Sequence, residues 1–291
     1  MTAIEFYRLT EEMLSNLAKT YYVDDLSKYY NLTDENTLGE IESEIKFNDL
    51  GEIEKVFVQI AFHGQNAQRI DKIVDFKNKF DFLYEVTQGF KPNEFLNKYK
   101  TDNLDESKNL LVKELRKGLK WNSEKSTKNP DATAKRFAGI LIRTAEYLSD
   151  FKTKEQVVND LMSNYENNDF EKLIEYFRRK IDIGFSVALS CDFLKEFDEK
   201  FTLPKPDTHM RDAMARYKKL SGGYKKNDKG NYQCIKDTLD VVNEINAELR
   251  ELGEKEISVY QFDRMVYLVC SQNFFLDDKE KGIKSVYLGK M

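Results

Sequence analysis

The chain has 291 residues, of which 41% are hydrophobic and 33% are charged, and its formal net charge is −5. This balance is typical of a globular protein and excludes an intrinsically disordered one. Because no run of eighteen apolar residues occurs and the N-terminus lacks the pattern of a signal peptide, we expect a cytoplasmic protein without a membrane partner. The cysteines Cys191, Cys234 and Cys270 are far apart and odd in number, which predicts buried free thiols.

Charge is distributed unevenly along the chain. Residues 1–60 hold 13 acids and 5 bases, whereas residues 108–136 hold 9 bases and 3 acids, and residues 201–230 hold 8 bases and 3 acids. Basic stripes of this kind allow a protein that is acidic overall to bind phosphate, although most lysine-rich helical faces are only solvated. The acidic first fifty residues predict helices packed outside the functional core.

Apolar residues recur at helical spacing along most of the chain, and alternating strand patterns are scarce. The predicted buried faces are, in chain order, Val56, Ile60 and His63; Phe137, Leu141, Thr144 and Leu148; Leu173, Ile174 and Phe177; and Phe262, Val266 and Val269. Breaks are predicted at 88–92, 123–131, 201–206 and 221–231. The pattern therefore predicts an all-α protein with an acidic helical segment at 1–50, a helical lobe at 51–170 and a functional region at 171–291.

The stretch from 175 to 217 reads as helix, tight turn, helix, extended loop and helix. The turn is Ile181-Asp182-Ile183-Gly184, where the glycine can take a positive φ and lets an anion approach the backbone. The next helix is predicted to begin near Phe185, and its free N–H groups suit a phosphate.

The extended loop carries two prolines, Pro204 and Pro206, which disfavour helix before the next element. Asp207 follows directly, at the predicted N-cap of the third helix. We interpret His209 as a structural hydrogen-bonding residue.

These residues resemble the helix-hairpin-helix DNA glycosylase superfamily (HhH-GPD), the group of endonuclease III, the adenine glycosylases and the alkyl-base glycosylases. The turn at 181–184 resembles the family's hairpin, Ala188 lies in its following helix, and Asp207-Thr208-His209 resembles its catalytic turn. Gly184 precedes Asp207 by 23 residues, close to the family's spacing. The segment 62–66 is similar to the turn whose glutamine fills the hole left by the extruded base, and 260–264 to the start of the closing helix. The four-cysteine iron–sulfur loop of some relatives is absent from the sequence.

The resemblance implies a two-lobed, all-α glycosylase-like fold with a helix-hairpin-helix DNA-binding element. It implies that Asp207 is catalytic, stabilising an oxocarbenium-like sugar and orienting water once the base is flipped out of double-stranded DNA. The second catalytic position is Ser186, which stands where strand-cleaving members carry a lysine. The implied activity is therefore monofunctional removal of a damaged or modified base, with no metal or organic cofactor, and we expect a monomer.

The implied DNA-binding residues lie in the hairpin, just before it, and in the glutamine turn: Ile181, Asp182, Ile183, Gly184, Phe185, Arg179, Lys180, Gln65 and Asn66. Asp182 replaces the first glycine of the family's hairpin and places a negative charge near the expected phosphate. It favours the alternative of a non-catalytic DNA-binding protein of the same fold. A helical interaction protein with no nucleic-acid role also stays open, and Gln65 fits a polar helix end as well as a DNA contact.

Overall fold

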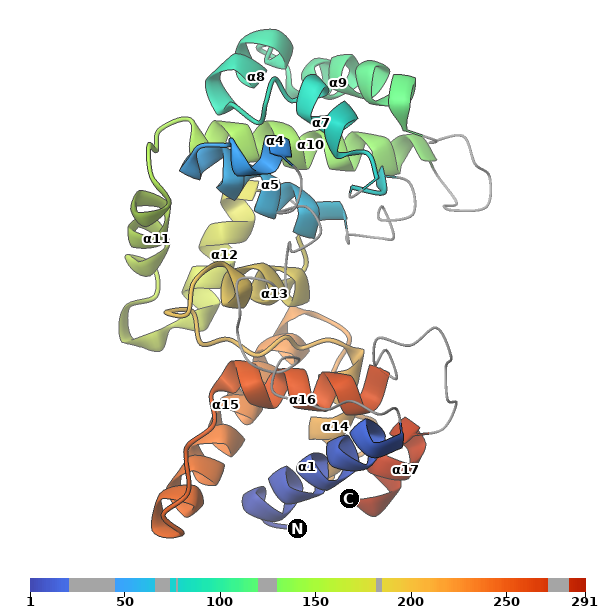
Figure 1. The fold of residues 1–291 in the computed structure, drawn as a ribbon, viewed down its shortest axis with the longest axis vertical. Helices are drawn as coiled ribbons and strands as arrows, with labels where there is room; N and C mark the ends of the chain where they lie inside the picture. The colour runs from blue at the N-terminus through green and yellow to red at the C-terminus, as the bar shows by residue number, and fades with distance from the viewer. Residues whose placement is uncertain (21–44, 66–73, 77, 120–129, 182–184, 272–282) are drawn as a thin grey trace. The chain divides into compact units, whose positions relative to one another are not determined.

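The computed structural model describes residues 1–20, 45–65, 74–76, 78–119, 130–181, 185–271 and 283–291 (Figure 1). Within these ranges the chain forms α-helices and one short 3-10 helix and contains no β-strand, which confirms the all-α prediction. None of the described helices has the length and hydropathy needed to cross a lipid bilayer. The chain folds into two compact units.

The first unit joins the N-terminal helix to the chain from Leu194 onwards. Its helices are α1 (Ala3–Thr20), the end of α13 (Val187–Phe197), α14 (Thr208–Tyr217), α15 (Asp228–Glu251), α16 (Val259–Ser271) and α17 (Ile283–Lys290). Helix α16 packs against α1, α14 and α17. The ring of Phe6 on α1 stacks on Tyr217 at 4.9 Å between centroids and meets the edge of Phe262 at 5.5 Å.

Helix α1 packs into the hydrophobic core of the first unit, although the acidic composition of the first fifty residues suggested a peripheral position. Phe6 and Leu14 are buried in one hydrophobic cluster with Met210, Ala213 and Val266, which come from α14 and α16. The units accordingly do not follow the predicted boundaries after residues 50 and 170. The acidic side chains of α1 lie on its outer face, so charge composition gave no indication of the apolar face that packs into the C-terminal helices.

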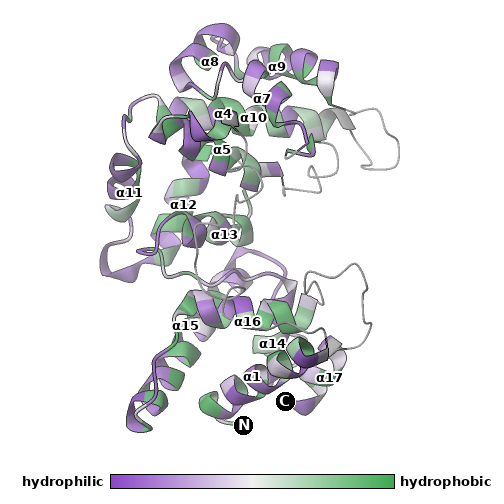
Figure 2. Ribbon diagram, viewed as in Figure 1, coloured by the Kyte–Doolittle hydropathy of each residue, from purple (hydrophilic) through white to green (hydrophobic). Residues whose placement is uncertain are grey.

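The second unit extends to Phe193 and is arranged around α10. Its helices are α4 (Ile45–Asn48), α5 (Glu52–Gln65), α7 (Phe80–Val86), α8 (Pro92–Tyr99), α9 (Leu104–Gly118), α10 (Pro130–Leu148), α11 (Lys154–Met162), the 3-10 helix η2 (Glu166–Asn168), α12 (Phe170–Ile181) and the start of α13. Helix α10 packs against α5, α8, α9 and α12. Figure 2 shows that α5 and α13 are largely hydrophobic and that α8 is mainly hydrophilic, consistent with α8 burying only one face.

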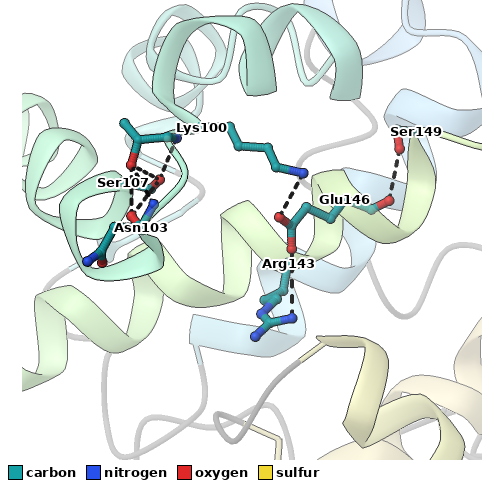
Figure 3. A network of polar contacts seen from close by, with 7 residues as sticks. Lys100, Asn103, Ser107, Arg143, Glu146 and Ser149 are labelled. Carbon is teal, nitrogen blue, oxygen red and sulfur yellow. Dashed lines mark hydrogen bonds and ion pairs between the residues drawn. The ribbon is translucent and has the colours of Figure 1, made fainter.

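Polar contacts join α8, α9 and α10 at the surface of this unit (Figure 3). Lys100, just after α8, forms an ion pair of 3.2 Å with Glu146 on α10, and Arg143 lies 3.8 Å from the second oxygen of the same carboxylate. Asn103 caps α9, and its carbonyl oxygen accepts a hydrogen bond of 3.2 Å from the Ser107 hydroxyl. Ion pairs that are open to solvent on at least one side contribute little to the free energy of unfolding.

The four helical faces predicted from apolar spacing lie on α5, α10, α12 and α16, and every residue named for them is buried. The breaks are less accurate. Helix α10 already includes Pro130, because proline suits the first helical turn. Helix α15 begins at Asp228, within the predicted break at 221–231, because the Asn227 side chain caps it by accepting from the Gly230 amide at 2.9 Å.

Candidate active site

Asp207 lies at the start of α14, where the sequence predicted an N-cap. Its Oδ1 accepts hydrogen bonds from the backbone N–H groups of His209, at 2.8 Å, and Met210, at 2.9 Å. These bonds satisfy two of the amides that a helix N-terminus leaves without intrahelical partners. The prediction that Asp207 caps this helix is confirmed.

The chain reaches Asp207 through a three-residue turn centred on Pro206. The Asp207 N–H donates to the carbonyl oxygen of Lys205 at 2.8 Å, which closes the turn. Both backbone amides donate to the same carboxylate oxygen, Oδ1. The other oxygen, Oδ2, accepts no hydrogen bond from the described residues. The residue is half-buried, and the two bonds to Oδ1 hold the carboxylate in one orientation.

A buried ion pair anchors the loop in front of Asp207. Lys195 on α13 pairs with Oδ2 of Asp263 on α16, and the two side chains are only 3% and 4% exposed. Oδ1 of Asp263 accepts a hydrogen bond of 3.1 Å from the backbone N–H of Lys205. One carboxylate therefore joins two helices to the residue two positions before Asp207.

Sequence reasoning missed this pair, although one signal was present. Lys195 follows Cys191 by four residues and so lies on the apolar face of its helix. A lysine at such a position requires a buried acid, because an unpaired ammonium group is costly to remove from water. Its partner is 68 residues away in the sequence, so only the tertiary fold identifies it.

His209 faces a small polar cluster on the first turn of α14. Its Nδ1 is 3.4 Å from the Nζ of Lys284 on α17, and that ammonium group forms an ion pair of 2.7 Å with Asp212. The imidazole also meets the Tyr267 ring edge-on at 5.7 Å. Burial lowers the pKa of His209 below its usual value of 6.5, and the nearby Lys284 ammonium group lowers it further against the opposing effect of Asp207.

We expect His209 to titrate below the ordinary histidine range. Because the pKa of His209 is lowered in the folded state, the unfolded chain binds the proton more readily. The stability contributed by this group is therefore complete above about pH 6.5 and decreases as the pH falls from there through the lower pKa of the folded protein. An NMR titration measures this directly, since the chain has 2 histidines and a His209→Asn variant assigns the resonance. A midpoint at or above 6.5 contradicts the described environment.

The helices on either side of the predicted hairpin are described, whereas Asp182, Ile183 and Gly184 lie outside the described residues. Helix α12 ends at Ile181, which is fully buried, and α13 begins at Val187. The predicted helix start near Phe185 is therefore two residues early. Ser186 is the residue that caps this helix.

Ser186 is exposed, and its Oγ accepts from the Leu189 N–H at 3.2 Å. Phe185 is fully buried against Phe177, with ring centroids 5.4 Å apart, and its carbonyl oxygen accepts from Nε of Arg178 at 3.0 Å. A contact between Phe185 and DNA is thus confined to its backbone.

The two basic residues predicted beside the hairpin, Arg179 and Lys180, are exposed on the last turn of α12. The Lys180 ammonium group lies 5.8 Å from the centroid of Tyr147 and 5.3 Å from that of Tyr176. Both tyrosine hydroxyls donate to Asp160, at 2.8 and 2.9 Å. This cluster joins α10, α11 and α12 and presents Lys180 at the surface next to the predicted hairpin.

Gln65 is the last residue of α5, as the sequence predicted for a helix end, and Asn66 lies outside the described residues. The Gln65 side chain is 6% exposed, and its Oε1 accepts from the Phe76 N–H at 3.2 Å. This hydrogen bond gives the Gln65 side chain a structural role. Gln65 would have to break the bond before its side chain could enter the DNA duplex. The DNA contact of Gln65 stays a prediction.

The structure brings Asp207 and His209 together on the first unit, and it places the residues flanking the hairpin on the second.

All three cysteines are buried and free, as predicted, and burial raises the pKa of Cys234 and Cys270 to about 12. Within the described ranges, no three His, Cys, Asp or Glu side chains gather as metal ligands. Comparison with protein-family models, curated proteins and solved structures found no match for this chain.

Proposed function

We propose that this protein is a monofunctional DNA glycosylase, which flips a damaged or modified base out of the duplex and hydrolyses its N-glycosidic bond. The observation that carries the proposal is the geometry of Asp207. One of its oxygens is fixed by two backbone amides, and the other accepts no hydrogen bond from the described residues. A carboxylate held in this way needs no reorganisation to act on a charge that develops beside it.

The chemistry requires little else from the protein. As the bond between the sugar carbon and the base nitrogen breaks, its electron pair leaves with the base and positive charge develops on the sugar. The Asp207 carboxylate stabilises that charge and orients a water molecule, whose hydroxyl adds to the sugar carbon while its proton passes through the carboxylate to solvent or base. The products are a free base and an intact abasic strand.

In this proposal the hairpin holds the DNA backbone. Gly184 and the amides of Phe185 and Ser186 bind one phosphate, with Arg179 and Lys180 close by on the same unit. The hydroxyl of Ser186 caps α13 and cannot form a Schiff base with the sugar, which supports base release without strand cleavage.

A non-catalytic DNA-binding protein is the second candidate, and two observations favour it. Asp182 places a negative charge in the hairpin sequence, and the Gln65 amide is already bonded to the Phe76 backbone rather than exposed. Such a protein binds duplex DNA with a steep salt dependence and leaves every base in place.

A panel of duplexes with different modified bases separates the two functions. We expect at least one duplex to acquire alkali-labile abasic sites, with no strand cleavage before alkali and no covalent complex after borohydride treatment. Binding without abasic sites on any duplex favours the non-catalytic protein. A borohydride-trapped complex shows instead that a lysine attacks the sugar, and Lys205 beside the turn is then the first residue to replace.

A further inference from the structure

The loop that follows α14 presents several exposed lysines to the solvent. The segment 218–229, here called the lysine loop, contains five lysines and one acid. Four of these side chains, Lys219, Lys225, Lys226 and Lys229, are exposed, and none forms an ion pair with a described residue. Elsewhere in the described chain, many exposed bases do have acidic partners, as in the pairs of Lys117 with Glu114 and Arg250 with Glu256.

The lysine loop is held in a defined conformation. The Arg211 guanidinium group donates to the carbonyl oxygens of Tyr224, at 2.7 Å, and Lys225, at 2.8 Å. A Cβ atom at Gly230 would come within 2.0 Å of the Lys225 oxygen, so the loop backbone packs directly on the first turn of α15. The lysines are therefore presented from a fixed backbone, which lowers the entropic cost of binding through them.

The surface beside these lysines is open to a large polyanion. Gly222 and Gly223 have φ values of +82° and +69° and are exposed, and a Cβ at Gly222 would meet no atom within 4 Å. They border a hollow of about 650 Å³ that is also lined by Arg216 and Lys219. The acid Asp212 also lines this hollow, where it forms an ion pair with Lys284. The exposed cations are spread along the loop beside it, which suits a chain of phosphates better than one small anion.

We propose that the lysine loop binds the phosphodiester backbone of duplex DNA beside the nucleotide on which Asp207 acts. This inference rests on the proposed glycosylase function. Asp207 caps the N-terminus of α14, and the lysine loop begins at the C-terminus of this ten-residue helix, about 15 Å away. The loop then returns to Arg211, near the start of the helix, which binds the carbonyl oxygens of Tyr224 and Lys225. The length of α14 corresponds to about four base pairs of a duplex. One bound duplex can thus reach both sites.

The test compares two variants that lose the same charge within the same unit. Lys225→Gln with Lys226→Gln removes two cations of the lysine loop, whereas Lys236→Gln with Lys255→Gln removes two exposed cations outside it. Binding of the full chain to an unmodified duplex is measured as a function of salt. Since each phosphate contact contributes about 0.9 to the slope of log K against log salt, the first variant should lower the slope by about 1.8. The second should leave it unchanged, and both should unfold at the wild-type midpoint.

Equal slopes of log K against log salt for the two variants overturn the proposal. Polyglutamate serves as a second polyanion: the proposal is also overturned if the wild-type chain binds polyglutamate as tightly as DNA and the first variant loses the same affinity for both. Base release is scored separately, so the two claims fail independently. A lower slope without abasic sites on any duplex keeps the lysine loop and rejects the chemistry. Base release with an unchanged slope in the first variant keeps the chemistry and rejects the role of the lysine loop. A wild-type chain that binds no duplex rejects both the lysine loop and the glycosylase function.

Discussion

Replacing Asp207 with asparagine should lower the rate of base release by about two orders of magnitude or more, the effect of removing one main electrostatic group from a catalytic site. Asparagine keeps the size of the side chain and still accepts from the His209 and Met210 amides, so α14 remains capped. The substitution removes the negative charge that opposes the developing cation on the sugar. DNA binding should be unchanged or tighter, because a negative charge near the DNA is lost. Single-turnover assays on the modified duplex and binding at one salt concentration measure the two effects.

A matched control is available on the second unit. Asp169 caps α12 by accepting from the Lys172 N–H at 3.0 Å, and it is exposed. Asp169→Asn makes the same chemical change at another helix N-terminus and should leave base release at the wild-type rate. A comparable loss in both variants assigns the effect to helix capping and not to charge at the reacting sugar.

Breaking the ion pair between Lys195 and Asp263 should produce the largest loss of stability. Lys195→Met leaves the Asp263 carboxylate 4% exposed and without its cation, which costs about 3–5 kcal/mol of unfolding free energy. Replacing both residues, as in Lys195→Met with Asp263→Leu, should recover most of that loss because no buried charge remains. Urea unfolding of the two single variants and the double variant measures the coupling between the side chains.

Activity distinguishes anchoring of the loop from stability alone. The Lys195→Met, Asp263→Leu chain is stable but lacks an acceptor for the Lys205 N–H, so the turn before Asp207 is released and base release should fall. Lys195→Met with Asp263→Asn retains an oxygen at that position and should keep more activity at similar stability. Equal activity in the two double variants contradicts a positioning role for Asp263.

Local features of the site were predictable from the sequence because they depend on neighbouring residues. Two prolines before an aspartate favour an extended loop and then an N-cap, and this is how Asp207 begins α14. The spacing of Phe137, Leu141 and Leu148 likewise identified a face that is fully buried.

Features that depend on distant parts of the chain were not predictable in this way. The pairing of Lys195 with Asp263 and the packing of α1 against α16 involve residues far apart in sequence, and periodicity within one helix does not report which helix covers its apolar face. The Gln65 side chain is similar, since its bond to the Phe76 backbone appears only once the chain after α5 is placed.

Release of a free base, detected by mass spectrometry, tests the central claim most directly. The wild-type chain, incubated with the modified duplex that it acts on, should release one base for each alkali-labile site formed. The Asp207→Asn variant should bind the same duplex and release about one hundredth as much in the same time. Equal release by both chains, or no free base from any duplex that the wild-type protein binds, would contradict the assignment of Asp207 as the catalytic carboxylate.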